Sequence, residues 1–197
     1  MRLLPCGDRA VLLDCESLTE ARRWHTALAG EHAGHIVLGA RTVLVHGDPS
    51  RIRDLVSRTS PADELVDATT AREVEIPVIY DGPDLDEVAR QTGLTSAQVV
   101  AAHTGTPWVA AFGGFAPGFS YLVDGDPRLN VTRRSTPRTA VPTGSVGLAG
   151  EFSGVYPRAS PGGWQLVGHT DLPTWDTTRD PAALLLPGTV VRFREAT

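Results

Sequence analysis

The chain has 197 residues, a formal net charge of −5, 41% hydrophobic and 21% charged residues, as an ordinary globular protein does. All 18 basic residues are arginine. The absence of lysine excludes a lysine Schiff base, the lysine of a phosphate-binding P-loop and a biotin-carrying lysine on this chain. The acidic balance argues against a generic nucleic-acid binder.

Targeting and metal signals are also absent from the sequence. No run approaches the roughly 18 apolar residues of a membrane span, and Asp8 and Arg9 interrupt the N-terminal segment too early for a signal peptide. We therefore expect a cytoplasmic protein. Cys6 and Cys15 form neither a disulfide framework nor a zinc pattern, and the histidines lack ligand spacing, so no metal site is expected.

The first part of the chain alternates strand and helix signals. Residues 9–15 indicate a buried strand, and Ser17 and Glu20 have the spacing of a capping box that starts a helix. The helix is expected to reach about Glu31, with Gly34 as its stop. Further along, we predict strands at 36–38 and 42–45 and a helix opened by Asp48 and Pro49. This β-α-β-β-α order predicts a ferredoxin-like α+β domain that lacks only a final strand.

A polar segment, residues 60–73, is poor in large apolar side chains and predicts a domain boundary. We therefore predict two domains, 1–73 and 74–197. Residues 74–80 indicate the first strand of the second domain, and Pro77 favours an edge position for that strand because proline donates no ladder hydrogen bond.

Two helices with a glycine between them follow that strand. Asp84 or Asp86 is expected to start the first helix and Gly93 to end it. Thr95 or Ser96 is expected to cap the second, which buries Val99, Val100 and His103. A DNA-binding helix-turn-helix has this layout, but the second helix carries no arginine to contact phosphates. A helical hairpin that closes a barrel is the preferred interpretation.

The remaining residues, 106–195, alternate short apolar segments with turn signals. Such spacing is typical of an all-β domain, here expected to close into a barrel. The predicted strands are 108–112, 145–148, 165–167, 184–186 and 190–194.

Three segments rich in glycine and proline concentrate the unusual composition of the chain: 113–122, 136–150 and 154–168. Aromatic residues stand between the glycines and prolines. Loops of this kind on a β scaffold often form a binding surface, although a barrel with many tight turns has the same composition.

Arginine and serine residues in these segments are candidates for chemistry. Arg133, Arg134 and Arg138 form the best anion site in the chain, because guanidinium groups hold carboxylates and phosphates in a fork. A solvated turn is the alternative. Ser145 lacks the strand–nucleophile–helix pattern of a hydrolase, so a structural or substrate-contacting role is favoured over a nucleophilic one. Trp164 either floors a pocket or fills the barrel.

Several of these motifs, in one order, resemble the KipI / PxpB family of 5-oxoprolinase B-subunits, also labelled allophanate hydrolase subunit 1, with carboxyltransferase subdomains C and D. They are GFAPGFSYL at 114–122, RRSTPRTAVPTGSVGLAG at 133–150, VYPRASPGGWQLVGHT at 155–170 and LLPGTVVRF at 185–193. The resemblance implies an α+β fold: an N-terminal α+β domain followed by a cyclophilin-like β-barrel. It leaves the catalytic residues unassigned. The substrate-binding positions that it suggests are Phe119, Tyr121, Arg134, Arg138, Ser145, Tyr156, Ser160 and Trp164.

The resemblance also implies a function shared with other subunits. With a KipA/PxpC-like partner (allophanate hydrolase subunit 2) and a LamB/YcsF-like subunit, family members form an ATP-dependent 5-oxoprolinase that converts 5-oxoproline to glutamate. The chain is then not expected to be active alone. Two alternatives are an allophanate hydrolase or urea carboxylase type of carboxyltransferase subunit, with biotin on another protein, and a KipI-like inhibitor of a sensor histidine kinase.

Overall fold

The computed structural model describes residues 1–31, 34–63 and 72–197. The chain divides into two compact units, Met1–Thr69 and Thr70–Thr197. Of the predicted boundary segment 60–73, residues 64–71 lie outside the described residues. Helices and strands occur in both units, and the second unit contains a nearly closed β-barrel.

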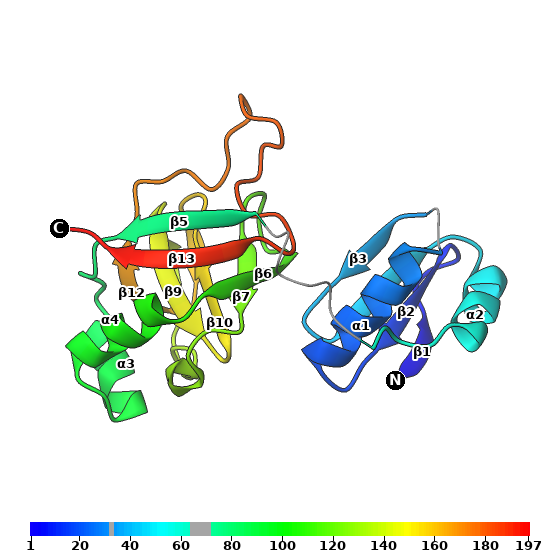
Figure 1. Ribbon diagram of the computed structural model, residues 1–197, viewed down its shortest axis with the longest axis horizontal. Helices are drawn as coiled ribbons and strands as arrows, with labels where there is room; N and C mark the ends of the chain where they lie inside the picture. Colours follow the sequence, from blue (N-terminus) through cyan, green and yellow to red (C-terminus); the bar gives the residue numbers. More distant parts are fainter. Residues whose placement is uncertain (32–33, 64–71) are drawn as a thin grey trace. The chain divides into compact units, whose positions relative to one another are not determined.

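The first unit is a four-stranded antiparallel sheet with two helices (Figure 1). The strand order is β1-β2-β4-β3. The three predicted strands are all present, and β1, which sequence patterns missed, pairs along the free edge of β2. The bounds are β1 (Arg2–Pro5), β2 (Ala10–Asp14), α1 (Leu18–Ala29), β3 (Ile36–Leu38), β4 (Thr42–His46) and α2 (Pro49–Arg58).

The helix starts of the first unit follow from local hydrogen bonding. The Ser17 side chain accepts from the Glu20 N–H at 3.1 Å, as predicted, whereas the Glu20 carboxylate accepts from the Glu16 N–H at 2.7 Å. Helix α1 has Gly30 as its C-cap and therefore ends before the predicted stop. Asp48 caps α2. The buried helix faces are Leu18, Ala21, Trp24, Leu28 on α1 and Ile52, Leu55, Val56 on α2.

The second unit is built on a seven-stranded sheet in the order β12-β9-β10-β7-β6-β13-β5, with a separate ribbon of β8 and β11. Strand β5 contains Pro77 and lies at one end of this order, as predicted. The elements of the second unit are β5 (Glu73–Val78), α3 (Leu85–Thr92), α4 (Ser96–Gly105), β6 (Trp108–Gly113), β7 (Ser120–Val123), η2 (Pro127–Leu129), β8 (Arg138–Val141), β9 (Ser145–Ala149), β10 (Phe152–Val155), β11 (Ser160–Gly162), β12 (Gln165–His169) and β13 (Val190–Glu195).

The two end strands of this sheet meet just beyond β5. Ile79 and His169 on β12 exchange both backbone hydrogen bonds at 2.9 Å. The next residues continue along β12, because the Gly82 N–H donates to the Val167 carbonyl at 3.2 Å. This contact between 79–84 and β12, here called the seam, nearly closes the barrel.

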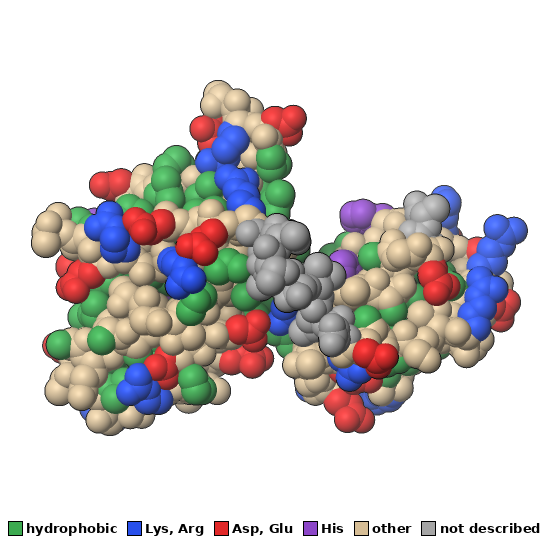
Figure 2. Space-filling view, viewed as in Figure 1, with side chains coloured by type: hydrophobic (Ala, Val, Ile, Leu, Met, Phe, Trp, Pro, Cys, Tyr) green, Lys and Arg blue, Asp and Glu red, His purple; other side chains and the backbone are tan. Residues whose placement is uncertain are grey.

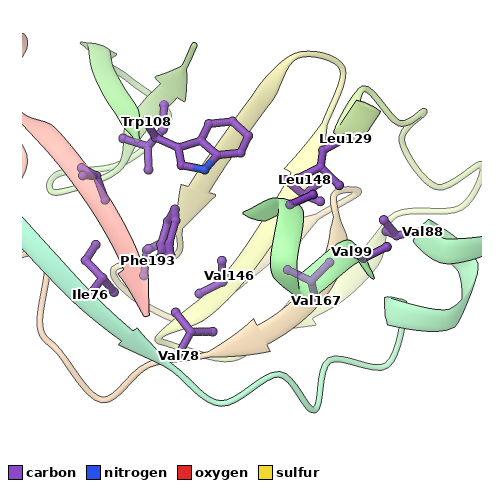
Figure 3. Packing of buried hydrophobic residues seen from close by; sticks show 14 of the residues in the cluster. Ile76, Val78, Val88, Val99, Trp108, Leu129, Val146, Leu148, Val167 and Phe193 are labelled. Atoms are coloured by element: carbon purple, nitrogen blue, oxygen red, sulfur yellow. The ribbon is translucent and has the colours of Figure 1, made fainter. Parts of the chain in front are cut away.

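Inward-facing side chains of the barrel strands fill its interior (Figure 3). Trp108 and Phe193 lie with the aliphatic residues Val146, Leu148 and Val167 in one buried cluster. Burial of this apolar surface is the main stabilising contribution to the unit, at about 25 cal/mol per Å².

One predicted strand is wrong. Residues 184–186 form no strand, although Leu184 and Leu185 are buried in the barrel core. The Leu184 N–H donates to the Thr174 carbonyl at 2.9 Å, within the long connection between β12 and β13 (Figure 1). The apolar run reflects burial of a loop, because a short buried segment has the same composition as a short strand.

Helices α3 and α4 form the predicted hairpin and pack against β12 and β13. Gly93 ends α3 in the left-handed conformation, and Thr95 and Gln98 form a capping box at the start of α4. Over β5 and β13, basic and acidic side chains stand side by side (Figure 2). None of the described helices is long and apolar enough to cross a bilayer.

A polar network crosses the buried end of α4. The His103 ring is fully buried, and its Nδ1 and Nε2 lie 2.7 Å from the Tyr80 hydroxyl and 2.9 Å from the Ser153 hydroxyl. Phe193 stacks on the ring at 4.2 Å. Burial lowers the pKa of His103 to about 3 from its ordinary value of 6.5. The imidazole of His103 is therefore neutral in the folded unit.

This pKa predicts a specific loss of stability in acid. The unfolded chain binds a proton at His103 below pH 6.5 and the folded chain does not, so the free energy of unfolding falls by about 1.4 kcal/mol per pH unit below that point. The variant His103→Gln is expected to be less stable at pH 7.5 and to lose this part of the slope. Urea unfolding between pH 7.5 and 4.5 measures both, with His35→Gln as the exposed control. Equal slopes in wild type and His103→Gln would contradict the prediction.

Candidate functional site

The outer face of the barrel carries a second apolar cluster. Val146 and Leu148 of β9 point into the barrel core, so the alternating residues Ser145, Gly147 and Ala149 face outward. Ala149 belongs to a separate buried cluster with Leu166 and several aromatic residues. The members of this outer cluster are Phe119, Val141, Ala149, Tyr156, Trp164 and Leu166, with Ala116, Tyr121 and Phe152 packed against it.

Four predicted site residues come together in the outer cluster. The ring of Phe119 lies 5.3 Å from Trp164 and 5.5 Å from Tyr156, and Tyr121 lies 5.7 Å from Trp164, all edge to face. Phe119, Tyr156 and Trp164 are only 2–4% exposed, so these rings pack mainly on one another. Burial raises the pKa of Tyr156. Phe115 stands beside them, exposed and in the left-handed conformation at φ 65°.

Glycines in the strands below make room for these rings. A Cβ on Gly154 of β10 would lie 2.8 Å from Phe119 Cζ and 3.1 Å from Trp164 Cζ3. A Cβ on Gly147 would lie 3.2 Å from Trp164 Cβ. Glycine inside a strand weakens it, and here it permits the close approach of aromatic rings to the sheet.

We predict that Gly154→Ala destabilises the barrel unit by about 1–3 kcal/mol, because the added methyl group overlaps two packed rings. Gly113→Ala is the matched control on β6, since its nearest neighbour is the Phe119 carbonyl at 3.7 Å. Urea unfolding of both variants measures the difference, and equal stability would contradict the packing described.

A buried carboxylate organises the polar part of the site. Asp84 is 3% exposed. Its Oδ1 accepts hydrogen bonds from Arg134 Nη1 at 2.8 Å and Arg138 Nη2 at 2.7 Å, and its Oδ2 accepts from the Leu166 N–H at 2.7 Å. Two of the three arginines of the predicted anion site therefore meet a carboxylate of the same chain. Leu166 connects this carboxylate to the outer aromatic cluster.

The charges around Asp84 leave a positive surplus. Burial raises the pKa of Asp84, but the hydrogen bonds from Arg138 and Leu166, with the two arginine charges, lower it overall. Arg138 Nη1 is buried and has no hydrogen-bond partner among the described residues. The exposed Arg133 places its guanidinium carbon 6.0 Å from the centre of the Trp164 ring. Two guanidinium groups thus bind one carboxylate, and a third lies over the Trp164 ring.

We predict that Asp84→Asn lowers the free energy of unfolding by about 3 kcal/mol or more, because two arginines lose their charged partner in a buried setting. Asp86→Asn is the control: Asp86 is an exposed carboxylate on α3 that accepts a hydrogen bond from Ser96, and its loss should cost less than about 1 kcal/mol. Equal losses in urea unfolding would contradict a central role for Asp84.

Neither predicted serine side chain is hydrogen-bonded to Arg134 or Arg138 among the described residues. The Ser160 hydroxyl donates to the Arg158 carbonyl at 3.3 Å, at the start of β11. Ser145 is directly opposite His169 in the pairing of β9 with β12. His169 Nδ1 in turn lies 2.8 Å from Asp81 Oδ1.

Sequence reasoning missed the contacts of Asp84, Asp81 and His169. Asp84 does precede α3 as predicted, but its side chain makes no cap hydrogen bond there. The segment ending in Asp84 is 82 residues from Leu166, and Asp81 is 88 residues from His169. No local pattern reports contacts at such separations.

Comparisons with known proteins agree with these features. The family model described as carboxyltransferase domain, subdomain C and D, matches residues 1–185. The chain belongs to this family. It is 40% identical over 201 residues to the 5-oxoprolinase B-subunit of Escherichia coli O157:H7, a match that covers 95% of this chain and 92% of that protein. A second 5-oxoprolinase B-subunit, from Bacillus subtilis (strain 168), is 46% identical over 125 residues, which are 62% of this chain and 52% of that protein. The resemblance inferred from the motifs is confirmed.

Solved structures of other proteins have the same fold. TTHA0988 matches with a TM-score of 0.77 and 36% identity over 96% of this chain, which spans only 40% of the TTHA0988 chain. PH0987 from Pyrococcus horikoshii matches with a TM-score of 0.62 and 31% identity, over 99% of this chain and 97% of that one. The Kluyveromyces lactis urea carboxylase matches with a TM-score of 0.74 and 22% identity. The match covers 99% of this chain and 22% of that one, and it shows a similar fold alone.

Proposed function

We propose that this chain is a subunit of an ATP-dependent 5-oxoprolinase, which opens the ring of 5-oxoproline to give glutamate. The observation that supports this most directly is the 40% identity to a protein named as the B-subunit of 5-oxoprolinase, over nearly the full length of both chains. A subunit name implies further subunits. We further propose that the complex contains a KipA/PxpC-like partner and a LamB/YcsF-like subunit, and that ATP is used by the assembled complex. We also propose that the first unit is ferredoxin-like and the second cyclophilin-like.

The outer cluster and its arginines are proposed as one wall of a shared active site. 5-Oxoproline carries a carboxylate, and a guanidinium group is the natural partner for it. Arg134 and Arg138 already bind Asp84, so they supply positive potential, and the exposed Arg133 is the group free to contact the substrate. Tyr121, with the buried Phe119, Tyr156 and Trp164, shapes the apolar side of the wall.

The experiment is glutamate release from 5-oxoproline by the purified complex with ATP. Arg133→Met is expected to raise KM for 5-oxoproline about tenfold with little change in kcat, because it removes a ground-state contact and leaves both bonds to Asp84 in place. Arg128→Met is the matched control, since Arg128 in η2 pairs with Asp126, the N-cap residue just before it. An unchanged KM would contradict the role of Arg133, and a complex without glutamate release would overturn the oxoprolinase function.

A carboxyltransferase subunit is the second candidate. The family model that matches residues 1–185 describes a carboxyltransferase domain. This function requires biotin on another protein, since the chain has no lysine to carry it. Carboxyl transfer to urea that depends on an added biotinylated carrier would support this candidate over the first. A KipI-like role would appear instead as a reduced rate of histidine kinase autophosphorylation.

A further inference from the structure

Asp81 and His169 form a hydrogen-bonded pair on the seam of the barrel. Asp81 Oδ1 lies 2.8 Å from His169 Nδ1. The backbone on both sides is held by ladder bonds, from Ile79 to His169 at 2.9 Å and from Gly82 to Val167 at 3.2 Å. A side chain on Gly82 would lie 2.3 Å from the Leu166 carbonyl, so the two segments are in close contact. The hydrogen-bonded backbone on both sides therefore fixes the position of the two side chains, which a functional group requires.

The geometry determines which ring nitrogen can exchange a proton. The Asp81 carboxylate binds Nδ1, so Nε2 is the nitrogen that can exchange a proton with a substrate or water. Among the described residues Nε2 has no hydrogen-bond partner. The side chains are 39% exposed for His169 and 60% for Asp81, so solvent and substrate can reach them. A carboxylate on one nitrogen orients the imidazole and stabilises the cation formed when the other nitrogen takes a proton.

Ser145 is the neighbour of His169 across the sheet. His169 uses its own backbone N–H and C=O on Ile79, and the Thr170 N–H donates to the Gly144 carbonyl at 2.9 Å. The pairing of Ser145 with His169 is therefore of the non-hydrogen-bonded kind, in which facing side chains stand closest. The Ser145 hydroxyl has no hydrogen-bond partner in the part of the chain that the structure describes. The Ser145 and His169 side chains thus face each other across the pairing of β9 with β12.

The same seam joins this pair to the arginine surface. Leu166, three residues before His169, donates its N–H to Asp84, and Asp84 holds Arg134 and Arg138. Asp81 and Asp84 are likewise three residues apart. The paired backbone of 79–84 and β12 therefore carries the Asp81–His169 pair and Asp84, and Asp84 holds the two arginines.

The geometry points to Asp81 and His169 as the acid–base pair of the ring-opening step, an inference that rests on the function proposed above. His169 Nε2 takes a proton from water while the water oxygen bonds to the amide carbon of 5-oxoproline. The carbon–nitrogen bond then breaks, and this proton passes from Nε2 to the ring nitrogen, which becomes the amine of glutamate. The new carboxylic acid releases the other water proton.

The first test uses the assembled complex. His169→Gln is expected to lower kcat about 100-fold or more, with KM within about threefold, because the loss is of proton transfer and not of binding. Asp81→Asn should lower kcat about tenfold, and Asp81→Glu should recover most of it. His35→Gln, an exposed histidine of the first unit, is the matched control. Thermal unfolding of each variant separates loss of proton transfer from loss of folding.

A second readout makes the outcome independent of 5-oxoproline. The isolated chain is assayed for hydrolysis of 4-nitrophenyl acetate, an activated ester that an imidazole base can cleave. Wild type should be at least tenfold faster than His169→Gln, and His35→Gln should equal wild type. An inactive complex with His169-dependent ester hydrolysis would remove the oxoprolinase function and keep the acid–base pair.

Two further outcomes overturn the pair. An active complex in which His169→Gln and Asp81→Asn keep wild-type kcat would leave the oxoprolinase function standing without this pair. If the complex is inactive and ester hydrolysis does not depend on His169, the oxoprolinase function and the acid–base pair are both overturned. Ser145→Ala is expected to keep kcat within about threefold, and a loss as large as that of His169→Gln would show that a serine, and not water, is the nucleophile.

Discussion

The site depends on one buried carboxylate. Asp84 accepts hydrogen bonds from two arginines and from the backbone of β12, at separations of 50, 54 and 82 residues along the chain. An unpaired charge in this position would cost several kcal/mol, so the carboxylate and its donors must be assembled together. Asp84 therefore couples the seam of the barrel to the segment 134–138, which ends at the first residue of β8.

The barrel strands serve two clusters at once. Their inner faces pack around Trp108 and Phe193, while the aromatic residues of the candidate site pack on the outer side of β9 and β10. The outer packing requires small residues in the strands, as the short distances at Gly147 and Gly154 show. A site built on packed strands is positioned more rigidly than one on a free loop.

Two aspartates three residues apart have opposite environments. Asp84 is buried among arginines, whereas Asp81 is exposed beside a histidine. The turn at Gly82 and Pro83 separates them and follows the β12 backbone closely. Burial and charge partners, and not residue type, make one carboxylate structural and leave the other exposed to solvent.

Local signals in the sequence determined those structural features that depend on residues close together in the chain. Ser17, Asp48 and Gly93 marked helix ends, and the ordered Gly/Pro motifs were enough to place the chain in its family. The short strands β7, β8, β10 and β11 were missed, and 184–186 was wrong, because segments of three or four residues have too little periodicity to separate a strand from a buried loop. Only the tertiary structure decided that Asp84 binds arginines instead of capping α3 and that Asp81 meets His169. Such contacts depend on strand register and on closure of the barrel, which bring together residues that no local pattern relates.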